Sequence, residues 1–204
     1  MSTTDDDRSN GWEAVAHRLI AGRSRIGVAT VRVWARSLPS GALILDLGCG
    51  TGVPVTEALG QDGFNVYGVD ASPSLVAAFR RRFPEAPVAC EPVEESTFFD
   101  REFDGVVAIG LLFLLSEPVQ RRVLSRVASA LNPTGRFLFT APEQECTWMD
   151  PLTGHPSRSL GAKVYREVLA SVGVTVMGSY VDEGENYYYD ARRMRSRIKT
   201  DEAV

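Results

Sequence analysis

Short apolar runs that alternate with helical patterns constrain the fold of this chain more than any other feature of its sequence. The runs occupy residues 42–47, 64–69, 87–90, 103–109 and 136–141. Helical patterns fill the intervals, and two of them open on a serine followed closely by a proline, at Ser72-Pro73 and Ser116-Glu117-Pro118. Strands that alternate with helices form a parallel sheet with both faces covered. We therefore predict an α/β fold with a doubly wound sheet.

The two ends of the chain extend this alternating core. Apolar stripes with helical spacing, separated by Gly22, predict helices ahead of the first strand. Apolar runs joined by the turn-like DEGEN segment predict a final antiparallel hairpin, and hence a seven-stranded, mostly parallel sheet. In that hairpin, alternation predicts that Tyr188 faces away from Tyr187 and Tyr189. The predicted organisation is a disordered tail (1–10), an N-terminal helical lid (11–38), the main domain (39–191, with a loop at 142–158 and a helix at 159–172) and a polar C-terminal tail (192–204).

Composition and charge argue against several classes of function. No apolar run approaches the ~20 residues that a membrane-spanning helix needs, and the acidic, polar start of the chain is unlike a signal peptide. The three scattered cysteines (Cys49, Cys90 and Cys146) and the two histidines show neither a disulfide framework nor a metal-ligand spacing. A net charge of −4 argues against nucleic acid as the main partner. We expect a cytoplasmic protein with no metal ion, no membrane association and no nucleic-acid partner.

A glycine-rich turn follows the first predicted strand, at the edge where open parallel sheets bind ligands. Its sequence, residues 46–52, is DLGCGTG, and the alternating glycines allow the backbone to turn tightly against a ligand. A dinucleotide-binding turn would have its third small residue at position 53, which is Val53. The Gly-Lys-Ser/Thr ending of a phosphate-binding loop is also missing from this sequence. The turn therefore favours a ligand other than a dinucleotide or a nucleoside triphosphate.

The chain resembles the class I S-adenosylmethionine-dependent methyltransferases over roughly residues 40–190. The resemblance rests on ILDLGCGTG (44–52), VYGVDAS (66–72), the segment around Glu91, FDGVVAI (103–109) and NPTGRFLF (132–139), which occur in the family's order. It implies a Rossmann-like sheet, S-adenosyl-L-methionine as the methyl donor and S-adenosyl-L-homocysteine as the product. Under this resemblance, Asp70 would accept both hydroxyls of the cofactor's ribose, and Asp46 would hold the turn and the cofactor's ammonium group. Capping of the next helix is the alternative role for Asp70, although Ser72 is better suited to it.

Further cofactor contacts are predicted from the same motifs and from the N-terminal segment. Glu91 has the family's adenine-side position, and Pro92 or Val93 is the alternative for that contact. Arg23 would pair with the cofactor's carboxylate, unless it is simply a solvated helix charge. The full predicted set of cofactor-binding residues is Trp12, Arg23, Asp46, Gly48, Cys49, Gly50, Thr51, Gly52, Pro54, Asp70, Ala71, Ser72, Glu91, Val93, Ile109 and Gly110.

Methyl transfer from a sulfonium is an in-line displacement, which needs positioning and exclusion of water more than it needs a nucleophile or a metal. The N-terminal helices and residues 142–158 are expected to cover the crevice and to close over it when the cofactor binds. Trp12 and Trp148 are candidates for a position near the sulfonium or an aromatic acceptor, with core packing as the alternative for Trp12. Asp150 is a candidate base in the same loop. The predicted catalytic set is Glu143, Trp148 and His155, although each acidic or histidine side chain is also compatible with an ordinary loop position.

The apolar residues 108–112 after the fourth strand suit a small organic acceptor. The sequence thus predicts a small-molecule methyltransferase. A non-catalytic S-adenosylmethionine-binding protein and an NAD(P)-dependent oxidoreductase are the alternatives, the latter disfavoured by the glycine spacing. The identity of the acceptor, the atom that is methylated and the oligomeric state remain open at this point.

Overall fold

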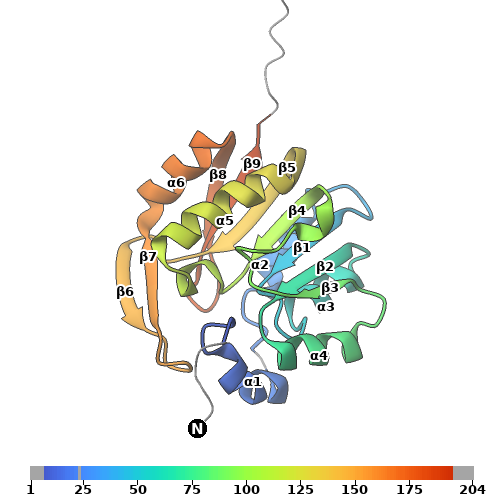
Figure 1. The fold of residues 1–204 in the computed structure, drawn as a ribbon. Coiled ribbons are helices and arrows are strands. Elements are labelled where there is room, and N and C mark those ends of the chain that lie inside the picture. Colours follow the sequence, from blue (N-terminus) through green and yellow to red (C-terminus); the bar gives the residue numbers. More distant parts are fainter. Residues whose placement is uncertain (1–6, 23, 195–204) are drawn as a thin grey trace, which may run out of the picture.

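The fold is built on a seven-stranded sheet with the strand order β3-β2-β1-β4-β5-β9-β8 (Figure 1). We describe it from a computed structural model, for residues 7–22 and 24–194. The strands are β1 (Leu43–Leu47), β2 (Asn65–Asp70), β3 (Val88–Cys90), β4 (Phe103–Ala108), β5 (Leu131–Thr140), β8 (Val174–Val181) and β9 (Tyr187–Arg193). β1 to β5 pair in parallel, whereas β9 lies antiparallel to both β5 and β8. This confirms the predicted doubly wound, mostly parallel sheet with a closing hairpin.

Helices cover both faces of the sheet. They are α1 (Trp12–Ala21), α2 (Val28–Ala35), α3 (Val55–Gln61), α4 (Pro73–Arg82), α5 (Glu117–Ala130) and α6 (Gly161–Ser171), with short 3₁₀ turns η1 (Phe98–Asp100) and η2 (Leu112–Leu114). α5 and α6 pack on one face, and α2 and α3 pack on the other (Figure 1). As predicted, Ser72 caps α4, because its hydroxyl accepts a hydrogen bond from Leu75 N at 3.2 Å. Ser116 precedes α5 without such a bond.

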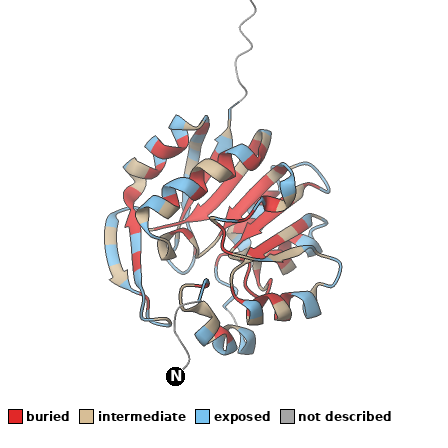
Figure 2. Ribbon diagram, viewed as in Figure 1, coloured by how far each residue is buried: buried red, intermediate tan, exposed pale blue. Residues whose placement is uncertain are grey.

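The central strands β1, β4, β5 and β9 are largely buried, as Figure 2 shows in red, whereas the edge strands β3 and β8 are more exposed. The alternation predicted for β9 is confirmed. Tyr188 packs with Trp34 of α2 on one face, whereas Tyr189 stacks on Phe139 at 4.7 Å between ring centroids on the other. Burial of this much aromatic and aliphatic surface supplies the main driving force for the fold.

Residues 142–158 differ from the prediction. Instead of a loop, most of this segment is an antiparallel hairpin of β6 (Glu145–Met149) and β7 (Pro156–Leu160), and α6 begins after it at Gly161. Exposed and half-buried residues alternate along β6, so the strand presents no continuous apolar run to the sequence. Backbone pairing and contacts with the rest of the fold define this hairpin. Near the C-terminus, β9 continues through Arg193, so the first two residues of the predicted C-terminal tail belong to a strand, and residues 195–204 of that tail lie outside the described part of the chain.

In the described ranges, none of the helices has both the length and the apolar composition of a membrane span. The same ranges bring no three His, Cys, Asp or Glu side chains together in a way that would hold a metal ion.

Candidate functional site

The glycine turn joins β1 to α3 and adopts a backbone that only glycine adopts easily. Gly48, Gly50 and Gly52 have φ angles of +69°, +55° and +80°. A Cβ on Gly52 would lie 2.4 Å from the Phe83 ring. The turn is tied to the neighbouring strand, because the backbone N–H groups of Gly48 and Cys49 donate to the carbonyl oxygen of Val69, at 2.8 and 3.1 Å. A rigid backbone surface at the carboxyl edge of the sheet results.

Asp70 ends β2 beside this turn, and its carboxylate is fixed by the backbone. Gly50 N donates to Asp70 Oδ2 at 2.8 Å, and Ser72 N donates to Asp70 Oδ1 at 2.9 Å. Asp70 therefore helps to hold both the turn and the start of α4, and its half-buried side chain also borders a cavity. Asp46 lies below the turn at 3% exposure, where it accepts a hydrogen bond from Thr56 Oγ1 at 2.7 Å.

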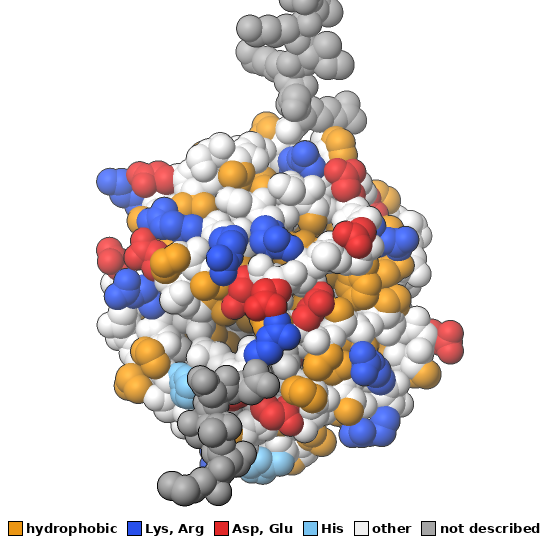
Figure 3. All heavy atoms as spheres, viewed as in Figure 1, with side chains coloured by type: hydrophobic (Ala, Val, Ile, Leu, Met, Phe, Trp, Pro, Cys, Tyr) orange, Lys and Arg blue, Asp and Glu red, His pale blue; other side chains and the backbone are white. Residues whose placement is uncertain are grey.

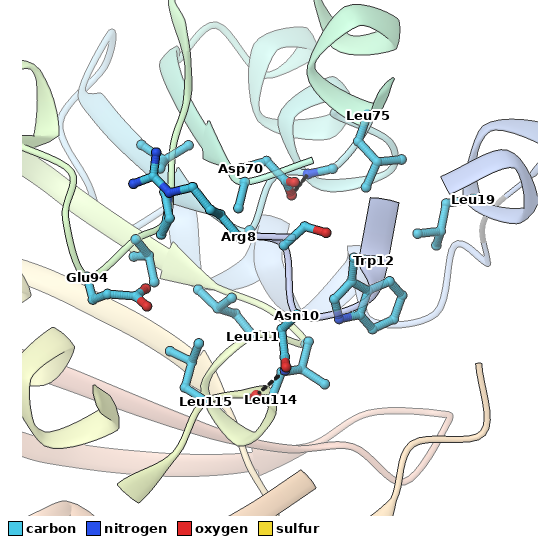
Figure 4. A pocket seen from close by; sticks show the side chains of 18 of the residues that line it. Arg8, Asn10, Trp12, Leu19, Asp70, Leu75, Glu94, Leu111, Leu114 and Leu115 are labelled. Atoms are coloured by element: carbon cyan, nitrogen blue, oxygen red, sulfur yellow. Dashed lines mark hydrogen bonds between the residues drawn. The ribbon is translucent and has the colours of Figure 1, made fainter. Parts of the chain in front are cut away.

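The cavity beside Asp70 has a volume of about 120 Å³ (Figure 4). It is lined by Arg8, Ser9, Asn10, Trp12, Leu19, Gly48, Gly50, Thr51, Val69, Asp70, Ala71, Leu75, Pro92, Val93, Glu94, Gly110, Leu111, Leu114 and Leu115. We call it the first cavity. Its walls combine aliphatic side chains with the backbone of the glycine turn. Trp12 and Asp70 are among the polar residues of this wall.

Trp12 contributes an unsatisfied donor to this wall. Its indole Nε1 is buried and has no hydrogen-bond partner. A buried polar group without a partner costs on the order of 1–3 kcal/mol, so such groups usually mark a place for water or a ligand. Because Trp12 borders the first cavity, we expect ligand binding there to bring an acceptor atom to this donor.

A second cavity lies on the other side of the glycine turn and has a volume of about 240 Å³. It is lined by Ser24, Ile26, Gly27, Val31, Asp46, Gly48, Cys49, Val53, Pro54, Val55, Ile109, Gly110, Phe113, Thr140 and Asn186. The two cavities share Gly48 and Gly110, so they adjoin at the ends of β1 and β4. Gly110 is held at this junction by Thr140, whose Oγ1 accepts a hydrogen bond from Gly110 N at 2.7 Å.

The N-terminal segment covers the first cavity and is anchored at one side by Glu13 of α1. The Glu13 carboxylate accepts hydrogen bonds from the Ser72 and Ser74 hydroxyls and, at 3.1 Å, from Ser74 N, at the start of α4. Burial raises the pKa of Glu13, but these hydrogen bonds outweigh it, and the net effect lowers that pKa below its ordinary value.

Asn10 anchors the same segment at the other side. Its amide nitrogen donates to Leu114 O at 2.8 Å, and its Oδ1 lies 3.0 Å from His155 Nδ1 on the turn between β6 and β7. Residues 7–10, predicted as part of a disordered tail, thus make defined contacts, and Asp7 accepts hydrogen bonds from Ser9 N and Gly11 N at 2.9 Å. Residues 1–6 of that predicted tail lie outside the described part of the chain.

The predicted catalytic residues lie outside both cavities. Glu143 is exposed and accepts a hydrogen bond from Tyr187 OH at 3.2 Å, and His155 faces Asn10. Trp148 packs against Phe113, a wall residue of the second cavity, with 5.4 Å between ring centroids. Asp150, the further candidate base, accepts hydrogen bonds from Leu152 N and Thr153 N in the hairpin turn. These geometries bring none of the candidate acids or bases to a cavity wall, although His155 and Trp148 each contact a residue that is in one.

Most of the predicted cofactor residues line one cavity or both. Trp12, Gly50, Thr51, Asp70, Ala71 and Val93 border the first, Asp46, Cys49, Pro54 and Ile109 border the second, and Gly48 and Gly110 border both. Gly52, Ser72 and Glu91 border neither of these two cavities, and Arg23 lies outside the described residues. On the adenine side, Pro92 and Val93, the alternatives to Glu91, border the first cavity together with Glu94. Sequence reasoning missed mainly wall residues from the N-terminal segment and from η2, namely Arg8, Ser9, Asn10, Leu19, Leu111, Leu114 and Leu115.

The strand order and the glycine turn define a class I methyltransferase fold, and comparison with known proteins agrees. Residues 44–135 match the methyltransferase domain family. Magnesium protoporphyrin IX methyltransferase from Synechocystis PCC 6803, solved with bound S-adenosylhomocysteine, superposes with a TM-score of 0.74 at 17% identity, covering 94% of this chain and 100% of that one. Over residues 44–135 the chain is thus similar to methyltransferase domains, and it shares the fold of the solved methyltransferase.

Curated relatives share a part of their length with this chain. The tRNA U34 carboxymethyltransferase of Hahella chejuensis is 30% identical over 132 residues, which are 58% of this chain and 40% of that protein. The cypemycin N-terminal methyltransferase of a Streptomyces species is 33% identical over 142 residues, which are 66% of this chain and 55% of that protein. The chain thus spans about half the length of the curated relatives it matches, and their names differ in the acceptor they imply.

Proposed function

We propose that this chain binds S-adenosylmethionine along the glycine turn and transfers its methyl group to a small-molecule acceptor. The observation that carries the proposal is that one donor and one acceptor border the same cavity. The donor is the unsatisfied indole N–H of Trp12, and the acceptor is the fixed carboxylate of Asp70. A nucleoside complements both, because its heteroatoms accept hydrogen bonds and its ribose hydroxyls donate them.

The first cavity suits an uncharged nucleoside better than a phosphorylated one. Among the described residues that line it, Arg8 is the only basic side chain, and its guanidinium pairs with Glu95. Asp70 would suit the ribose of either ligand, so the discrimination rests on the lack of a second basic side chain, among the described residues of this wall, for a pyrophosphate. These features argue for S-adenosylmethionine over NAD(P) as the ligand of this turn.

The amino-acid end of the cofactor would then extend past Gly48 and Gly110 toward Asp46 in the second cavity. We keep Arg23 as a predicted partner for the cofactor's carboxylate, since the neighbouring Ser24 borders that cavity. When bound, the cofactor supplies an electrophilic methyl group on a positively charged sulfur. The residues of the chain contribute orientation and exclusion of water around that methyl group.

The N-terminal helices and the β6–β7 hairpin act in this proposal as a cover over the cofactor. Glu13 fastens α1 to the start of α4, and Asn10 joins the N-terminal segment to η2 and to His155. Hydrogen exchange with and without S-adenosylhomocysteine tests this role. Protection should rise in residues 11–21 and 142–158 as well as in the glycine turn, and a response confined to the turn would reduce α1 to plain packing.

A small molecule is the favoured acceptor class over a nucleic acid, even though relatives named for tRNA are among the matches. The net charge is −4, and Figure 3 shows acidic and basic side chains interspersed on the face in view. A nucleic-acid partner would favour a continuous basic stripe. Apolar side chains also dominate the wall of the second cavity.

Titration calorimetry followed by turnover tests the proposal. S-adenosylmethionine and S-adenosylhomocysteine should bind, whereas NAD should not. A methyl-donor assay on a panel of metabolites and on bulk tRNA then separates a small-molecule enzyme from an RNA-modifying one, and binding without turnover on any substrate would favour the non-catalytic alternative. Preferential binding of NAD would refute the assignment of the turn.

A further inference from the structure

The second cavity has almost no ionisable groups in its wall. Half of the side chains that line it are aliphatic, and Phe113, which packs against Trp148, adds an aromatic surface. Asp46 and Cys49 are the ionisable residues among the lining residues described. A cationic group that entered this space would meet the Asp46 carboxylate, whereas an anion would find an opposite charge only on the sulfonium of the bound cofactor.

Neither of these two groups is suited to take a proton from an acceptor. Asp46 is 3% exposed, accepts a hydrogen bond from Thr56 Oγ1, and in the proposed function faces the cofactor's ammonium group. Cys49 is 4% exposed, and its Sγ lies 2.7 Å from where a Cβ on Gly68 would be, so its thiol points into the packing against β2.

The charged and titratable groups behind the wall are engaged with other partners. Around the entry to α2, Glu183 Oε1 accepts a hydrogen bond from Gly27 N at 3.1 Å, and Asp182 accepts one from Tyr188 OH at 2.9 Å. Burial, and then the Asp182 carboxylate, raise the pKa of Tyr188, so this phenol stays protonated. Arg25 forms an ion pair with Glu57 at 2.8 Å. No element around the cavity thus presents an available base within the described residues.

Thr140 is the polar side chain best suited to orient an acceptor. It comes from the end of β5, borders the cavity, and its Oγ1 accepts a hydrogen bond from Gly110 N at 2.7 Å. Because that bond uses the oxygen as an acceptor, the hydroxyl proton is a donor that can point into the cavity. A hydroxyl donor next to the shared residue Gly110 would stabilise an acceptor atom that carries negative charge or a lone pair.

From these observations we infer that the second cavity is the acceptor site and that its substrate is a small aromatic thiol or phenol. Such a molecule is acidic enough to lose its proton to water, and it attacks as the resulting anion. This inference rests on the proposed function. An apolar cavity of about 150 Å³ accommodates benzene, so the volume of about 240 Å³ found here leaves room for one ring beside the end of the cofactor.

The transfer balances without a base from the protein. The acceptor loses its proton to water before it enters, and its sulfur or oxygen then forms a bond to the methyl carbon. The bond from that carbon to the cofactor's sulfur breaks, and its electron pair stays on this sulfur, which becomes a neutral thioether. An anion and a sulfonium cation cancel their charges in this reaction, and a low-dielectric wall strengthens their attraction.

The pH dependence of turnover gives the sharpest test. Substituted thiophenols and 4-nitrophenol should be methylated by the full chain, and the rising limb of the pH–rate profile should move with the pKa of each acceptor. Benzyl alcohol, which has the same size but does not ionise, should not react. A limb at one pH for all acceptors would reveal an enzymic base and overturn the inference. Preference for benzylamine or benzoate would overturn the acceptor class, as would binding of S-adenosylhomocysteine without methylation of any thiol or phenol.

Binding of the acceptor itself supplies a readout apart from turnover. With S-adenosylhomocysteine present, Val55→Phe, which fills part of the second cavity, should weaken 4-nitrophenol binding about tenfold or more, and by a larger factor than it weakens binding of S-adenosylhomocysteine, whose amino-acid end shares this cavity. Val33→Phe, at a position 62% exposed on α2, is the matched control and should change neither. Unchanged 4-nitrophenol affinity in Val55→Phe would locate the acceptor elsewhere. If S-adenosylhomocysteine itself fails to bind the native chain, the proposed function fails first, and this inference fails with it.

Thr140 has its own pair of variants. Thr140→Val removes the hydroxyl donor and should lower kcat/KM for the thiol and phenol acceptors about tenfold or more, whereas Thr140→Ser should restore most of it. Valine keeps the shape of threonine without its hydroxyl, and serine keeps the hydroxyl without the methyl group. Equal activity in Thr140→Val and the native chain would therefore remove Thr140 from the acceptor site.

Discussion

Replacement of Trp12 by phenylalanine should move affinity and stability in opposite directions. The indole Nε1 of Trp12 is buried in the wall of the first cavity and has no partner. Without ligand, this donor destabilises the fold, and its removal should leave the free protein as stable as before or slightly more stable. With the cofactor bound, the same donor should be satisfied, so its removal should weaken binding.

The size of the binding effect follows from the value of one neutral hydrogen bond. A net contribution of about 0.5–1.5 kcal/mol corresponds to a dissociation constant about 2- to 13-fold larger. Calorimetric titration with S-adenosylhomocysteine measures this ratio, and thermal unfolding without ligand measures the change in stability. Ring packing is largely kept, because phenylalanine fills much of the indole's place in the cavity wall.

The other two tryptophans serve as controls. Trp34 Nε1 donates to Asp190 at 3.1 Å in the buried core, so Trp34→Phe should lower stability and leave the affinity for S-adenosylhomocysteine unchanged. Trp148 lies outside the first cavity, and Trp148→Phe should leave that affinity unchanged as well. The reasoning is refuted if Trp12→Phe binds S-adenosylhomocysteine as tightly as the native chain, or if it loses stability as Trp34→Phe does.

Three further predictions concern the turn, the ribose site and the cover. Asp70→Ala should weaken S-adenosylhomocysteine binding by ~1.5–3 kcal/mol and, because Asp70 also holds Gly50 N, should lower the melting temperature of the free protein; calorimetry showing unaltered affinity would remove its ribose role. Gly50→Val should abolish binding, since φ is +55° there, whereas Cys49→Ser should retain most of it, and activity lost with affinity intact in Cys49→Ser would reveal a missed nucleophile. Because the pKa of Glu13 is lowered in the fold, its ionised form stabilises the docked α1 at pH values above the ordinary glutamate pKa of about 4.3, and this contribution is lost as the pH falls below that value. Hydrogen exchange of α1 in the native chain should show this loss. An identical pH dependence in Glu13→Gln would assign the loss to other groups.

The sequence by itself determined the elements that rest on local patterns. Apolar runs of the right length specified the strands of the sheet, and Ser72 with Pro73 specified the start of α4, because capping depends on neighbours in the chain. The glycine turn was equally readable, since its three positive φ angles require glycine whatever surrounds them. Asp70 could also be named from the sequence, because it follows the apolar run of the second strand within the VYGVDAS segment that resembles the family.

Only the tertiary structure decided which distant segments complete the site. Arg8, Asn10 and Leu114 border the first cavity because the N-terminal segment folds over η2, and no local pattern encodes that contact. The β6–β7 hairpin was missed for a related reason, as its strands are held by each other and carry no continuous apolar face. Nothing in the residues next to Glu13 indicates that its carboxylate accepts hydrogen bonds at the start of α4, about 60 residues further along the chain. The glycine turn and the strand ends follow from short-range sterics and periodicity. The cavity walls and the N-terminal cover follow from long-range packing, because there a residue's role depends on partners that the residues next to it in the sequence do not specify.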